Sequence, residues 1–92
     1  MKTQDFLHIQ NKIQSNYPDS IILDVEETFY PNRGWIKTVG TMNAYTSPEE
    51  FIRRLKIMIS GGATNFNFKV NDEYNQIRYP DYSAKELFSS NK

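Results

Sequence analysis

The chain has no cysteine and only one histidine, so several kinds of chemistry are excluded at the outset. Without cysteine there is neither a disulfide framework nor a thiolate metal site. The single histidine, His8, lies beside the apolar stripe of an expected helix, and imidazole metal sites generally recruit a second strong ligand. Gly61-Gly62 is not followed by the Gly-Lys-Ser/Thr of a phosphate-binding loop. We therefore expect no catalytic residue, no metal and no cofactor.

Long apolar runs and an excess of charge are also lacking. No segment approaches the roughly 18 apolar residues that span a bilayer, and Met1–His8 lacks the apolar core of a secretory signal. We expect a cytoplasmic protein without a membrane partner. The 11 basic and 11 acidic residues balance, which argues against a polyanion such as duplex DNA as the main partner.

Aromatic residues, by contrast, are abundant: six Tyr, six Phe and one Trp make up 14% of the chain. Aromatic side chains bury a large area per residue, which suits a small core, and any surplus is available for an interface. The length of 92 residues predicts a single small domain over 1–92, and its tail is expected to fray from about residue 89. The α+β class follows from the order of the elements described below.

Helices are expected at 4–16, 47–60 and 83–88. The middle helix has the clearest signals, because Ser47 can act as N-cap, Pro48 suits the first helical position and Glu50 can complete a capping box. Gly61-Gly62 supplies the left-handed residue that ends it. The first helix shows an apolar stripe with three- and four-residue steps, and Pro18 prevents its continuation.

Strands are expected at 20–30, 35–45, 63–71 and 74–79, where apolar and polar residues alternate. The first two flank the turn 31–34 and therefore form an antiparallel hairpin. On the first strand, Ile21, Leu23, Val25 and Phe29 are expected on the buried face, and Asp24, Glu26, Thr28, Tyr30 and Ile22 on the other. The order α-β-β-α-β-β-α predicts a two-layer α+β sandwich, with a mainly antiparallel sheet of three or four strands and helices on one face.

The expected core combines the apolar faces of these elements. It consists of Phe6, Ile9, Ile13, Ile21, Leu23, Val25, Ile36, Leu55, Ile59, Phe66, Phe68 and Val70.

Two groups of residues are candidates for function. Asp24 and Glu26, with Glu27, form the densest acidic cluster, and paired carboxylates can bind a hard cation or act as acid and base. A solvated strand face is the preferred explanation, because no third ligand stands at a recognisable spacing. The second group consists of candidate interaction residues, three aromatic and three basic: Tyr30, Trp35, Tyr45, Arg53, Arg54 and Lys56. Such aromatics can stack on bases and such cations can contact phosphates, but an aromatic-rich hairpin and a polar helix face explain the same residues.

Four segments follow one another as a strand end, an acidic first helical turn, a helix end and a second strand: Val39-Gly40-Thr41, Glu49-Glu50, Gly62-Ala63 and 66–70. In this order they resemble the YdgH/BhsA-like family of small enterobacterial stress-response and biofilm proteins, over about residues 35–70. The passage from helix through Gly-Ala to strand is also similar to the YbjQ-like family of small cytoplasmic domains, which are described as heavy-metal-binding. The resemblance implies a bacterial, stress-related protein that forms homo-oligomers and has no catalytic residues.

Three hypotheses about function follow. The first is a non-enzymatic module that acts through protein–protein contacts or self-association, because aromatic residues are in excess and sheet edges can pair. The alternative is a small nucleic-acid-binding or regulatory protein that uses the basic helix face of Arg53, Arg54 and Lys56. The third, an enzyme that uses Asp24 and Glu26, has the weakest support.

Overall fold

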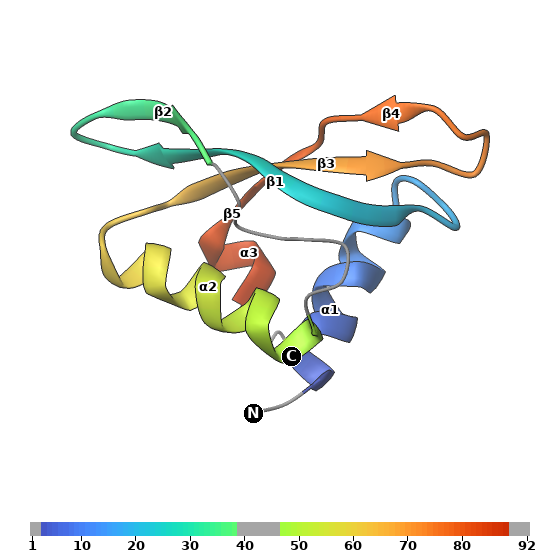
Figure 1. The fold of residues 1–92 in the computed structure, drawn as a ribbon, viewed down its shortest axis with the longest axis horizontal. Helices are drawn as coiled ribbons and strands as arrows, with labels where there is room; N and C mark the ends of the chain where they lie inside the picture. Colours follow the sequence, from blue (N-terminus) through green and yellow to red (C-terminus); the bar gives the residue numbers. More distant parts are fainter. Residues whose placement is uncertain (1–2, 39–46, 89–92) are drawn as a thin grey trace.

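The computed structural model describes residues 3–38 and 47–88, which adopt an α+β fold (Figure 1). The elements are α1 (Thr3–Gln14), β1 (Ile21–Tyr30), β2 (Gly34–Lys37), α2 (Pro48–Ser60), β3 (Asn65–Asn71), β4 (Ile77–Arg78), β5 (Asp81–Ser83) and α3 (Ala84–Phe88). The expected α+β class, antiparallel sheet and helical layer are confirmed. The part of the second expected strand at 39–45 lies outside the described residues.

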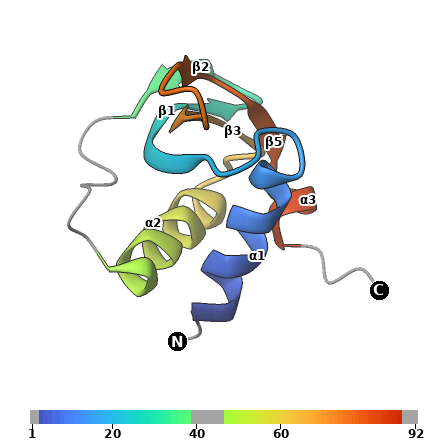
Figure 2. The ribbon, with the colours of Figure 1, turned by 90° about the vertical axis from the view of Figure 1, so that its right-hand side faces the viewer.

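The sheet is antiparallel throughout, in the order β2-β1-β3-β4, with β5 also paired to β3. Arg78 of β4 pairs with Val70 of β3. Asp81 of β5 follows Arg78 by three residues and pairs with Asn67, which precedes Val70 by three residues. The two short strands therefore keep one register and form a single edge that is interrupted at Tyr79-Pro80. This explains why five strands are present where three or four were expected. The helices of the described residues all lie on one side of the sheet, as Figures 1 and 2 show.

Strand β1 contains two bulges. Its pairing with β3 shifts by one residue between Ile22 and Asp24 and again between Val25 and Glu27. At each shift β1 has one more residue than its partner, and such a bulge interrupts the two-residue alternation of side chains. The buried residues of β1 are therefore Ile22, Val25 and Thr28, at every third position.

The bulges overturn the predicted faces of β1, because the prediction assumed an uninterrupted period of two. Ile21 and Phe29 lie on the face opposite to Val25, and Leu23 is outside the core. Conversely, Ile22, Thr28 and Tyr30, expected on the polar face, point toward the helices. Ile21 is 61% exposed, so its predicted place in the core is wrong.

The core lies between the sheet and the three helices. Seven of the predicted core residues are buried: Ile9, Ile13, Val25, Leu55, Phe66, Phe68 and Val70. Phe6 and Ile59 are partly buried against them, and Ile36 is half-buried. The prediction omitted Ile22, Phe51, Ile52, Ala63, Tyr82 and Leu87, which are also buried. Phe68 is at the centre, with its ring 6.3 Å from that of Phe51 on α2 and 6.1 Å from that of Tyr82 on β5.

The predicted ends of the later helices are largely confirmed. Ser47 Oγ accepts a hydrogen bond from the Glu50 backbone N–H at 3.2 Å, and Gly62 adopts the left-handed conformation with φ of 107°. A capping box begins α3: the Ser83 N–H donates to the Glu86 carboxylate at 2.9 Å and the Glu86 N–H donates to Ser83 Oγ at 3.1 Å. The predicted capping box at α2 is wrong in its second half, because the Glu50 carboxylate accepts hydrogen bonds from Arg53 and Arg54 instead.

No helix among the described residues is both long and apolar enough to cross a membrane.

Candidate functional site

The sheet has one face turned away from the helices, which we call the open face. Strand pairing arranges its side chains in four rows: Trp35–Phe29–Asn65–Ser83, Lys37–Glu27–Asn67–Asp81, Asp24–Lys69 and Ile21–Asn71–Ile77. The register shared by β4 and β5 adds Tyr79 to the third row. Four of the seven large apolar side chains that are exposed in the described residues belong to it: Ile21 (61%), Trp35 (44%), Ile77 (42%) and Tyr79 (53%). The open face is therefore the main exposed apolar surface of the described chain.

One end of the open face is aromatic. Trp35 of β2 pairs with Phe29 of β1, and their ring centroids are 5.3 Å apart at an angle of 57°. Gly34 with φ of 85° closes the hairpin turn just before Trp35, and this conformation favours glycine. The tight hairpin thus holds the only tryptophan of the chain half-exposed at the corner of the sheet.

The middle rows are charged. Lys37 Nζ lies 2.7 Å from Glu26 Oε2, and this hydrogen bond lowers the pKa of Glu26, with the nearby Lys69 acting in the same direction. The same bond raises the pKa of Lys37, and Glu27 and the Tyr79 hydroxyl add to that rise. Tyr79 lies opposite Lys69 on the open face, because the hydrogen bond from the Phe68 N–H to the Pro80 carbonyl at 2.9 Å continues the register shared by β4 and β5.

Acidic groups outnumber basic ones in these rows. The rows contain Asp24, Glu27 and Asp81, and the ion pair with Lys37 adds the Glu26 carboxylate; against Lys37 and Lys69 this leaves a net charge of −2. The opposite end is aliphatic, because Ile21 and Ile77 both pair with Asn71. The open face therefore has an apolar row at each end and an acidic centre.

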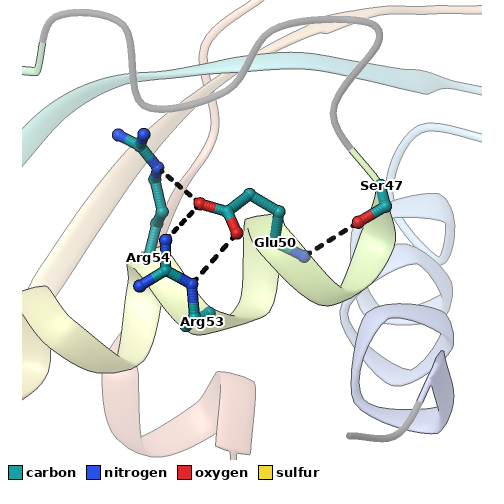
Figure 3. Close-up of polar contacts among 4 residues, drawn as sticks. All are labelled: Ser47, Glu50, Arg53 and Arg54. Carbon is teal, nitrogen blue, oxygen red and sulfur yellow. Dashed lines mark hydrogen bonds and ion pairs between the residues drawn. The ribbon is translucent and has the colours of Figure 1, made fainter.

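The three basic candidates do not form one cationic surface. Arg53 donates to Glu50 Oε1 from Nε at 3.0 Å and to Oε2 from Nη2 at 2.5 Å, and Arg54 Nε donates to Oε2 at 3.1 Å (Figure 3). These hydrogen bonds, Arg53 first, lower the pKa of Glu50 to about 2. Lys56 is separate: its Nζ lies 3.2 Å from Asp5 Oδ2 and 5.7 Å from the centre of the Phe88 ring.

The remaining aromatic candidates are not together either. Tyr30 packs against the core, with the Arg33 guanidinium 5.7 Å from its ring centre. Tyr45 lies outside the described residues. Of the five predicted interaction residues that the structure describes, Trp35 alone is on the open face.

The acidic pair is engaged in local interactions. Asp24 Oδ1 accepts a hydrogen bond from the Val25 backbone N–H at 2.8 Å, and Glu26 is bound to Lys37. The described residues contain no cluster of three or more His, Asp or Glu side chains able to hold a metal ion. His8 is half-buried on α1, and its Nε2 atom is buried without a hydrogen-bond partner in the described structure.

Sequence reasoning missed Ile21, Phe29, Ile77 and Tyr79 as members of one surface. The available signal was the polar face of the third expected strand, with Asn65, Asn67 and Lys69. Any neighbouring strand must add its own side chains to that face. The bulges of β1, however, cannot be recognised in the sequence, so the residues that β1 contributes could not be predicted.

Comparisons with models of protein families, with curated proteins and with solved structures returned no match.

Proposed function

We propose that this chain is a non-enzymatic interaction module that binds a protein partner through the open face of its sheet. The observation that carries the proposal is the gathering of Ile21, Trp35, Ile77 and Tyr79 on one face, away from the helices. Exposed apolar residues scattered singly are ordinary on proteins, whereas here four of the seven in the described residues share one face, which has an apolar row at each end and a charged centre. Aromatic residues are also enriched at the energetic centres of protein interfaces.

Charge favours a protein over a nucleic acid as the partner. A polyanion is attracted by an excess of Lys and Arg, but the centre of the open face has a net charge of −2. On α2, a phosphate would compete with the Glu50 carboxylate for both arginines. The basic residues of α2 therefore give nucleic-acid binding less support than the sequence alone suggested, because both arginines are already bound to Glu50.

The proposal is tested by site-specific photo-crosslinking in an extract of the native host. A photoreactive phenylalanine analogue replaces Trp35 in one variant and Tyr74 in the control. Tyr74 is 73% exposed but lies in the β3–β4 turn, beside Tyr17 and Asp72. We expect a discrete protein adduct from position 35 and none from position 74. Adducts from both positions alike, or from neither, would refute the proposal.

Self-association is the homo-oligomeric form of the same proposal. Light scattering across protein concentration distinguishes it, because a dimer formed through the open face would be weakened by Trp35→Ala and not by Tyr74→Ala.

A further inference from the structure

We infer that the partner of the open face is a cationic amphipathic helix, about four turns long, that carries apolar residues toward both ends and Lys or Arg between them. This inference rests on the proposed function and names the chemistry of the partner. It follows from the length of the face, its charge, its area and the kind of backbone that a sheet face can accept.

The spacing of the apolar rows sets the length. Trp35 and Phe29 lie at the row of Asn65, whereas Ile21 and Ile77 lie at the row of Asn71. These two rows are six residues apart along β3, which is about 20 Å at roughly 3.3 Å per residue. A helix rises about 1.5 Å per residue, so about 14 residues reach from one row to the other.

The charge sets the composition of the middle of the helix. Between the apolar rows, Asp24, Glu26, Glu27 and Asp81 face Lys37 and Lys69 only. Because Glu26 is paired with Lys37 and Asp24 is engaged in local interactions, a helix that lies along the strands meets the acidic surplus carried by Glu27 and Asp81. Lys or Arg at its centre would complement this surplus, and acidic residues there would be repelled.

Area and charge both disfavour a second copy of this chain as the occupant. The sheet is at most four strands wide over the 20 Å length, so the footprint is at most roughly 400 Å² per copy, or about 800 Å² for two, below the roughly 1,200–2,000 Å² of stable interfaces. Two copies would also bring two acidic centres together. A helix about 10–12 Å wide fits this footprint, and the small area predicts weak, reversible binding.

Backbone hydrogen bonding favours a helix over an extended segment. An extended peptide laid across a sheet face would leave its backbone N–H and C=O groups facing side chains, whereas strands bind at sheet edges. A helix satisfies its own backbone and presents only side chains. The three helices already packed on the other face of the sheet show the same kind of contact.

The test uses two synthetic 18-residue amphipathic peptides with the same leucine positions, one with Lys and one with Glu at every polar position. Trp35 is the only tryptophan and lies on the open face, so its emission reports binding directly. We expect a saturable blue shift with the Lys peptide, none with the Glu peptide, and amide shift changes in β1 and β3. The chain is neutral overall, so a preference for the Lys peptide must come from a local surface.

A double variant and a matched control localise the effect. Glu27→Gln with Asp81→Asn removes two charges from the open face and is expected to weaken binding about fivefold. Glu49→Gln with Glu73→Gln removes two charges elsewhere and is expected to leave binding unchanged. Far-UV circular dichroism verifies that both variants fold.

The inference is overturned if the Lys peptide does not bind, if the Glu peptide binds as tightly, if the two double variants behave alike, or if the shift changes map to the helices. It is also overturned if light scattering shows a dimer that Trp35→Ala weakens, but the proposed function then stands. Failure of the proposed function is a separate result, namely the absence of a specific adduct at position 35.

Discussion

Ile21 and Ile22 are neighbours of the same type, and they offer a direct test of the bulged register of β1. Uninterrupted alternation would bury Ile21 and expose Ile22, whereas the structure exposes 61% of Ile21 and only 7% of Ile22. Substitution of each by alanine costs the same strand propensity. The difference between the two variants therefore reports burial alone.

The magnitude follows from the buried carbons. Ile22→Ala removes three carbon atoms, worth about 2.4 kcal/mol at roughly 0.8 kcal/mol per buried methylene, and any cavity that remains adds to this within the usual range of about 2–5 kcal/mol. Ile21→Ala removes mostly hydrated surface and should cost about 0.5 kcal/mol. Two kcal/mol is a large share of the stability of a small domain, which is typically about 5–15 kcal/mol.

Urea unfolding followed by far-UV circular dichroism measures both variants. With an m-value of about 1 kcal/mol per molar, Ile22→Ala should lower the midpoint by about 2 M and Ile21→Ala by no more than about 0.5 M. Equal losses, or a larger loss for Ile21→Ala, would refute the bulged register and restore the faces that alternation predicts.

Three further outcomes are expected on α2. Leu55→Ala should lower the free energy of unfolding by about 2–5 kcal/mol in urea melts, because Leu55 is fully buried, while the exposed Ile57→Ala should change it little. Ser47→Ala should cost about 1 kcal/mol in the same assay through loss of the N-cap. The Glu50 carboxyl should titrate at about 2 by NMR instead of 4.5, and Arg53→Gln should raise this value. Because the folded pKa is lowered, the contribution of this ion pair to stability is present above pH 4.5 and lost as the pH falls toward 2.

Local chemistry allowed much of the fold to be predicted. Ser47-Pro48 begins α2 and Gly62 ends it because capping and left-handed backbone depend on residues close in sequence. Strand β3 was predicted with its correct faces, since Phe66, Phe68 and Val70 alternate with polar residues without interruption. The open face was less accessible, because a surface is defined by which strands lie side by side.

The arginines on α2 show the same limit. Their sequence indicates a cationic patch, and the i, i+3 and i, i+4 spacing to Glu50 also permits an ion pair on the same helix. Only the folded helix shows that one carboxylate binds both guanidinium groups. A charge pattern alone does not distinguish a binding site from an internal ion pair.

The sequence by itself determined the α+β class, the helix caps and the polar face of β3, because each depends on contacts within a few residues. The tertiary structure alone decided the bulges of β1, the union of β4 and β5 into one edge, and the meeting of Trp35, Tyr79, Ile21 and Ile77 on the open face. The physical reason is register: one additional residue on one strand turns every later side chain to the other face, and only pairing with β3 fixes where that happens.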